Sequence, residues 1–165
     1  MLSSELVEPA QRIAAILRDR GETLAVAEGS AGGLISAALL SVPGASVYYV
    51  GGTVIYTLAA SRAWMTGVID TPAGMRGATE GFAAYLAESV AGKLDATWGL
   101  AEAGAAGPPN RYGDPAGHSW LAVHGPSTAT HQLLTGLDDR EANMVAFAAG
   151  ALRLLTDVLG RANAA

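Results

Sequence analysis

The sequence contains no cysteine and only one lysine, Lys93, among its 165 residues. Without cysteine the chain forms neither disulfides nor thiolate zinc sites, and a cysteine nucleophile is excluded. Charged residues are also scarce, at 15% of the chain, and the formal net charge is -5. Because nucleic-acid binding depends on clustered Lys and Arg side chains, we expect no nucleic-acid partner.

Long apolar runs and a basic amino-terminal segment are missing as well. Arg, Asp, Glu or Gly interrupts every apolar stretch before it reaches the roughly eighteen residues that a membrane-spanning helix needs. Residues 1–9 carry Glu5 and Glu8 and no basic residue, which is the reverse of the start of a secretory signal peptide. We therefore expect a cytoplasmic protein with no membrane partner.

The sequence does have enough apolar material for one core, at 50% of its residues. Its length, with no visible linker or repeat, predicts one domain over residues 1–165. Asp138 and Glu141 predict a capping box at the last helix. Alternation of apolar runs with helical periodicity predicts an α/β sandwich with a mixed, partly parallel sheet. The predicted helices cover residues 5–20, 34–40, 59–65, 79–93 and 139–159, and the predicted strands cover residues 23–27, 53–57, 98–103, 120–123 and 130–135.

Two predicted loops are rich in glycine. Residues 29–33 follow a strand and precede a helix, so their N–H groups are candidates for binding a phosphate, although a tight strand-to-helix turn explains them equally well. Residues 104–117 hold four glycines and three prolines, which predicts a long loop of the kind that is usually functional. Glu28 and Glu102 each end an apolar strand, so we expect either a carboxylate pair at the ligand edge of the sheet or simple solvation.

Several segments match known sequence motifs, and they occur in a fixed order along the chain. Residues 27–33 read Ala-Glu-Gly-Ser-Ala-Gly-Gly, close to the signature Ala-Glu-Ser-x-Thr-Gly-Gly. Further matching segments are Val-Pro-Gly-Ala-Ser-Val-Tyr-Tyr at 42–49, Gly-Gly-Thr-Val-Ile-Tyr-Thr at 51–57, Gly-Ala-Ala-Gly-Pro at 104–108 and Pro-Ala-Gly-His-Ser-Trp-Leu-Ala-Val at 115–123. Together they resemble the CinA C-terminal family over nearly the whole chain. The resemblance implies a three-layer α/β/α sandwich.

The same resemblance implies an activity, which is hydrolysis of the carboxamide of nicotinamide mononucleotide to nicotinic acid mononucleotide and ammonia. The family site uses a serine, a lysine and a tyrosine; carried over by position, the nucleophile falls on Ser46 and the tyrosine on Tyr56. The resemblance also implies a homo-oligomer, and we expect neither a metal nor a cofactor. The residues then expected to bind the nucleotide substrate are Glu28, Ser30, Gly32, Gly33, Gly104 and Arg140, the last of them at the ribose phosphate.

The chain departs from the family pattern at the position of the lysine that would act as the catalytic base. The family lysine aligns with Ser61, and the next residue is Arg62; neither side chain deprotonates a serine near neutral pH. Hydroxyl residues of the family pattern are also replaced, by Gly29, Ala31 and Ala103. The rival hypothesis is therefore a divergent member that binds a nucleotide or another small molecule without deamidating it.

Other residues leave further alternatives open. His118 is either a substitute base that the long loop brings to the serine or a structural histidine at a strand entrance. Lys93 fits a solvated residue at the end of its helix better than a base. A third reading is an interaction module, in which Trp64 and Met65, or residues 47–50, form a dimer contact.

Overall fold

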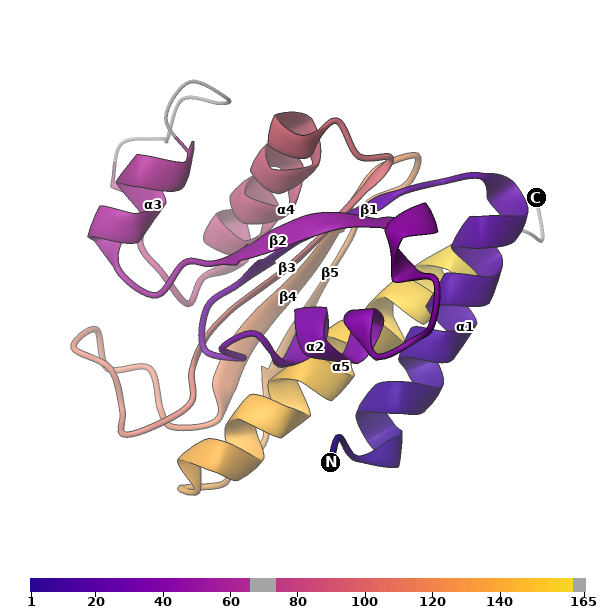
Figure 1. Cartoon of the computed structure of the whole chain (residues 1–165). Coiled ribbons are helices and arrows are strands. Elements are labelled where there is room, and N and C mark those ends of the chain that lie inside the picture. Colours follow the sequence, from indigo (N-terminus) through magenta and orange to yellow (C-terminus); the bar gives the residue numbers. More distant parts are fainter. Residues whose placement is uncertain (66–73, 162–165) are drawn as a thin grey trace.

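A five-stranded sheet divides the molecule into two helical layers (Figure 1). The computed structural model describes residues 1–65 and 74–161. The strand order is β2-β1-β3-β4-β5; β1 pairs in parallel with β2 and β3, and β4 is antiparallel to both of its neighbours. The strands are β1 (Leu24–Glu28), β2 (Tyr49–Val54), β3 (Trp98–Ala105), β4 (His118–His124) and β5 (Ala129–Leu134).

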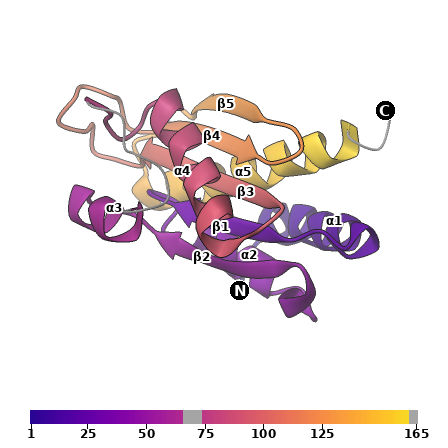
Figure 2. The same cartoon turned by 90° about the horizontal axis from the view of Figure 1, so that it is seen from above.

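The helices lie on both faces of this sheet (Figure 2). One face is covered by α1, α2 and α5, and the other by α4 with α3 beside it. This arrangement confirms the predicted three-layer α/β/α sandwich with a mixed sheet. The helices are α1 (Ser4–Arg20), α2 (Leu34–Leu40), α3 (Leu58–Met65), α4 (Glu80–Leu94) and α5 (Arg140–Arg161), and a short 3-10 helix, η1 (Ala45–Val47), precedes β2.

Successive side chains along the central strands point alternately to the two helical layers. On β1, Leu24 and Val26 pack with α1, α2 and α5, whereas Ala27 packs with α4. The small residues on the second face let α4 lie close to the sheet. At Gly99 the approach is closest, since a Cβ there would lie 1.9 Å from the carbonyl oxygen of Ala87.

The order of the parallel strands creates a crevice at their carboxyl ends. The connection that leaves β1 leads to α2 on one face, and the connection that leaves β2 leads to α3 on the other. β3 then pairs with the opposite side of β1. Open α/β sheets bind ligands at such a reversal of strand order. Glu28 and Glu102 are register partners on β1 and β3 at this position.

The strand boundaries differ from the prediction, most of all in β2. β2 covers Tyr49–Val54 rather than 53–57, because its partner β1 ends at Glu28, whose carbonyl accepts the N–H of Ile55 at 2.7 Å. The chain therefore leaves the sheet before residue 56. β3 continues to Ala105, past the predicted end at 103, because it stays paired with β4 as far as His118.

Helix α5 also differs from the prediction. Asp139 caps it, with Oδ1 accepting the N–H of Ala142 at 2.9 Å, so the predicted capping box of Asp138 and Glu141 is wrong. By length and composition α5 could cross a membrane, which the count of uninterrupted apolar residues had excluded. In the fold, 56% of its most apolar window is buried inside the molecule, as in the core helix of a globular protein.

A buried hydroxyl on α4 leads to a stability prediction. The Oγ of Ser89 has no hydrogen-bond partner within the part of the chain that the structure describes. Because an unpaired buried hydroxyl costs free energy, we expect Ser89→Ala to raise the free energy of unfolding by about 1 kcal/mol in urea denaturation. The control is Ser41→Ala, which removes a hydroxyl that donates to the Ala38 carbonyl at 2.7 Å and should give no gain. Equal effects of the two substitutions would contradict the prediction.

Candidate functional site

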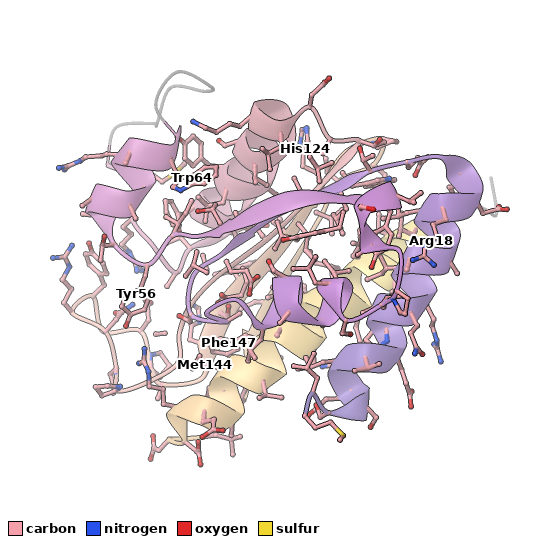
Figure 3. All side chains as sticks on the ribbon, in the orientation of Figure 1. Arg18, Tyr56, Trp64, His124, Met144 and Phe147 are labelled. Atoms are coloured by element: carbon pink, nitrogen blue, oxygen red, sulfur yellow. The ribbon has the colours of Figure 1, made fainter. Side chains whose placement is uncertain are left out.

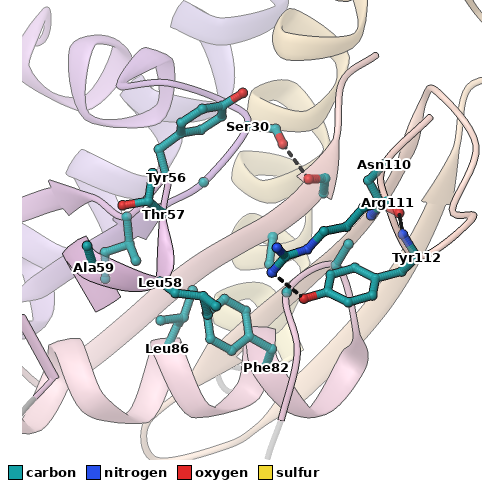
Figure 4. A pocket seen from close by; sticks show the side chains of 16 residues that line it. Ser30, Tyr56, Thr57, Leu58, Ala59, Phe82, Leu86, Asn110, Arg111 and Tyr112 are labelled. Carbon is teal, nitrogen blue, oxygen red and sulfur yellow. Dashed lines mark hydrogen bonds between the residues drawn. The ribbon is translucent and has the colours of Figure 1, made fainter. Parts of the chain in front are cut away.

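A cavity of about 510 Å³ opens at the carboxyl ends of β1, β2 and β3 (Figure 4). It lies where the reversal of strand order opens the crevice, and its size suits a ligand of mononucleotide size. Segments far apart in the sequence form its wall. They are residues 29–30 after β1, 55–59 between β2 and α3, 77–78 with Phe82 and Leu86 at α4, 103–104 on β3, and 110–112 in the loop before β4.

The cavity wall is apolar on one side and polar on the other. Phe82 and Leu86 of α4 belong to the same apolar cluster as Ile55 and form the apolar side. Across the cavity, the hydroxyl of Ser30 donates to the carbonyl of Gly104 at 2.6 Å. The structure thus places the predicted residues Ser30 and Gly104 at the cavity, and their part in substrate binding stays a prediction.

The glycine-rich loop after β1 binds an anion that the protein itself supplies. The carboxylate of Glu28 accepts the N–H groups of Gly33 at 2.9 Å, Ile35 at 3.0 Å and Ser36 at 2.8 Å, and the Ser36 hydroxyl at 2.5 Å. These N–H groups belong to the amino end of α2, where a phosphate was expected to bind. Glu28 therefore fills the predicted phosphate position, and neither Glu28 nor Gly33 lines the cavity.

Gly32 also points away from the cavity. A Cβ at this position would lie 2.9 Å from the methyl group of Met144 on α5, and its N–H donates to the carbonyl of Gly29 at 3.3 Å. Its backbone has φ +66°, which favours glycine. The structure accounts for Gly32 through the turn and its packing against α5.

Glu102 holds the first half of the same loop. Its Oε2 accepts the N–H groups of Ala31 at 2.7 Å and Gly29 at 3.1 Å, and its Oε1 accepts the hydroxyl of Ser119 at 2.8 Å. The side chain is fully buried, and burial, aided by the neighbouring Glu28 carboxylate, raises its pKa from 4.5 to about 7 against the lowering effect of these hydrogen bonds. Both glutamates therefore support the loop that borders the cavity.

Ser46 and Tyr56 do not meet within one chain. Ser46 lies in η1 before β2 and Tyr56 follows its end, so a strand of six residues, roughly 20 Å long, separates them. Tyr56 borders the cavity and is 63% exposed. Figure 3 shows Tyr56 at one end of the sheet and Arg18, which donates to the Pro43 carbonyl near Ser46, at the other. The two side chains that the family resemblance assigns to one site therefore lie far apart in this chain, and Ser46 as nucleophile stays a prediction.

Arg140, the predicted phosphate ligand, binds protein groups at the start of α5. Its guanidinium donates to the Tyr56 hydroxyl at 2.8 Å and to the carbonyl of Gly107. The guanidinium carbon lies 6.0 Å from the centre of the Tyr56 ring. Arg140 does not line the cavity. Its visible effect is to connect Tyr56 to the long loop.

The candidate bases lie outside the cavity wall. Nε2 of His118 lies 3.0 Å from the Ala78 carbonyl, and Nδ1 lies 3.5 Å from the amide of Gln132. Lys93 donates to the carbonyl of Trp64 and lies over its ring, which ties α4 to α3. His118 is the first residue of β4, and its ring contacts the backbone of Ala78 and the side chain of Gln132, as expected of a histidine with a structural role. Among residues 1–65 and 74–161, no lysine, histidine, aspartate or glutamate lines the cavity.

Among the cavity residues that the prediction missed are Asn110, Arg111 and Tyr112, in the loop between β3 and β4. The glycine and proline content of residues 104–117 marked this loop as functional but did not indicate which side chains would face the cavity. Asn110 closes a turn here, since its Oδ1 accepts the N–H groups of Tyr112 at 2.9 Å and Asp114 at 3.1 Å.

The sequence-based expectations about metal binding and assembly stay predictions. In the described portions of the chain, no three His, Asp or Glu side chains gather as a metal ion would require. The expected homo-oligomer stays a prediction. Val47 and Val50, one of the suggested contacts, are exposed at the outer strand β2.

Comparison with known proteins identifies the family. The family model of the CinA C-terminal domain matches residues 7–159. This chain belongs to the CinA C-terminal family. A CinA-like protein from Myxococcus xanthus is 37% identical over 115 residues, which is 69% of this chain and 27% of that protein. The chain therefore spans about a quarter of the length of this curated relative.

Solved CinA structures match the whole domain. The competence/damage inducible protein CihA from Agrobacterium tumefaciens superposes with a TM-score of 0.86 at 27% identity, covering 97% of this chain and 98% of that one. A CinA superfamily protein from Klebsiella pneumoniae gives the same TM-score at 26% identity, covering 94% and 98%. The CinA fold accordingly extends over nearly all of this sequence.

Proposed function

We propose that this chain binds a nicotinamide nucleotide, or a small molecule of similar shape, in the cavity at the ends of β1, β2 and β3, and does not hydrolyse its amide. The observation that carries the proposal is the composition of the cavity wall. A flat ring fits against Phe82 and Leu86, and hydroxyl and backbone groups around Ser30 face the polar part of the ligand. The chain belongs to the CinA C-terminal family, and the activity that this resemblance implies, on nicotinamide mononucleotide, supports a nucleotide as the ligand.

Amide hydrolysis requires a nucleophile, a base to accept its proton, and donors for the developing oxyanion. The hydroxyl of Ser30 already donates to a backbone carbonyl, and the described wall has no side chain with the basicity to activate it. The serine of the first family block is Gly29 here, on the cavity wall. Deamidation of nicotinamide mononucleotide, which the family resemblance implies, is the competing function, and Tyr56 at the cavity favours it.

The test measures binding and turnover on the same protein. We expect nicotinamide mononucleotide to raise the thermal unfolding midpoint of the wild-type chain without releasing ammonia. Ala59→Trp, at an exposed position on the cavity wall, should abolish the shift by filling the cavity. Ala37→Trp, at an exposed position of α2 on the opposite face, is the matched control and should keep it.

Each outcome decides between the two functions. Ammonia release that Ser46→Ala or Ser30→Ala abolishes would establish a deamidase and overturn the proposal of binding alone. A midpoint unaffected by the nucleotide, or one that shifts equally in Ala59→Trp, would refute binding in this cavity.

A further inference from the structure

Among the described residues that line the cavity, Arg111 is the only one with a charged side chain. Figure 4 shows it extending from the loop before β4 toward the middle of the cavity, opposite Phe82 and Leu86. Its wall position contrasts with that of Arg140, whose guanidinium binds Tyr56 and the loop backbone. A positive charge that faces an apolar surface across a cavity favours a ligand with a ring at one end and an anion at the other.

Nearby acidic groups do not neutralise Arg111. The closest acidic side chain along the loop, Asp114, forms an ion pair with Arg76 at 2.5 Å and accepts the amide of Asn110 at 2.8 Å. Within residues 1–65 and 74–161, Arg111 forms no ion pair. One of its N–H groups donates to the Tyr112 hydroxyl at 2.8 Å, which leaves most of the five guanidinium donors for a ligand.

The loop holds Arg111 and Tyr112 in place before any ligand arrives. The turn that Asn110 closes joins them to Asp114, whose ion pair with Arg76 ties the loop to the segment before α4. The guanidinium carbons of Arg111 and Arg76 each lie 4.9 Å from the centre of the Tyr112 ring. The Tyr112 hydroxyl accepts from Arg111 and so keeps its own proton to donate.

We infer that Arg111 and the Tyr112 hydroxyl bind the oxyanion of a ligand whose flat ring lies against Phe82 and Leu86. The ligand class is a ring that carries a phosphate or a carboxylate. The planar donor fork of arginine matches both groups. This inference rests on the proposed function and deepens it, because it assigns the anionic group to Arg111 in place of the amino end of α2, which Glu28 fills, and of Arg140.

Three small probes test the inference apart from the nucleotide. Phenyl phosphate and benzoate carry a ring with an oxyanion, and benzamide has the shape of benzoate without the charge. Dissociation constants from NMR titration should show both anions binding the wild-type chain at least about tenfold more tightly than benzamide. Arg111→Ala should remove that difference, and Arg111→Lys, which keeps the charge but loses the fork, should retain part of it. Arg153→Ala, an exposed position on α5, is the charge-matched control and should leave it intact.

The outcomes separate this inference from the proposed function. If the anions bind through Arg111 but nicotinamide mononucleotide does not bind, the inference stands and the nucleotide proposal fails. If the nucleotide binds but Arg111→Ala loses no more affinity for the probes than Arg153→Ala, the inference fails and the proposed function stands. No preference for the anions over benzamide, or no binding of any probe to the wild-type chain, would also overturn the inference. A stronger effect on phenyl phosphate than on benzoate identifies phosphate as the preferred oxyanion.

Discussion

Replacing Glu28 by alanine is expected to lower the free energy of unfolding by about 4 kcal/mol, because the buried backbone donors at the start of α2 would lose their acceptor. The carboxylate accepts the N–H groups of Gly33, Ile35 and Ser36, and the residue before α2 provides no side-chain cap. Each unsatisfied donor costs roughly 1–3 kcal/mol, although water rehydrates those near the surface. Urea denaturation followed by circular dichroism measures the change.

The control for this substitution is Glu8→Ala, at an exposed position of α1. Removing that carboxylate should change stability by less than about 0.5 kcal/mol. Glu28→Gln keeps one acceptor oxygen and is expected to fall between the two. If Glu28→Ala loses no more stability than Glu8→Ala, the carboxylate does not hold the amino end of α2.

The stability of the fold is expected to fall as the pH rises from about 5 to 8, because Glu102 keeps its proton more strongly when folded than when unfolded. Burial raises its pKa from 4.5 to about 7. The stabilisation from the bound proton is fully present below pH 4.5 and is lost as the pH rises through about 7. Since one pKa unit corresponds to about 1.4 kcal/mol, the loss from this group is of the order of 3 kcal/mol.

Glu102→Gln isolates this contribution. The amide oxygen can accept from Gly29 and Ala31, and the amide nitrogen can donate to the Ser119 hydroxyl, so the variant resembles the protonated acid. Urea denaturation at pH 5, 6, 7 and 8 should show a flatter profile for the variant than for the wild type. Glu141→Gln, at an exposed position of α5, should keep the wild-type slope. Parallel profiles for the wild type and Glu102→Gln would show that another group causes the pH dependence.

Both glutamates hold the glycine-rich loop from one face of the sheet, and the cavity lies on the other face. Along β1 and β3, alternate side chains point to opposite faces, and Val26 and Leu100 face α1, α2 and α5. Glu28 and Glu102 are two residues further along and lie on that same face, whereas the cavity is on the face of Ala103 and α4. The carboxylates therefore support the loop from behind, and the cavity keeps an apolar wall with Arg111 opposite it.

The layers of the fold and the family could be inferred from the sequence alone. Buried apolar runs and amphipathic periods predicted the five strands and the five α-helices, because these patterns follow from burial on one or two faces. They did not indicate η1 or the start of β2 at Tyr49. The family blocks placed Ser30 and Gly104 near one another, and the structure brings both to the cavity. The glycine and proline content of residues 104–117 also indicated the loop that provides Arg111.

Which groups face the cavity depends on the packing of the folded chain. The register between β1 and β2 put residues 55–57 outside the sheet and left Ser46 at the far end of β2. The amino end of α2 favours any nearby anion. The folded structure shows that the carboxylate of Glu28 occupies this position. Likewise, Arg111 and Arg140 are alike as residues in the sequence; their different roles follow from which partners the fold places within hydrogen-bond distance.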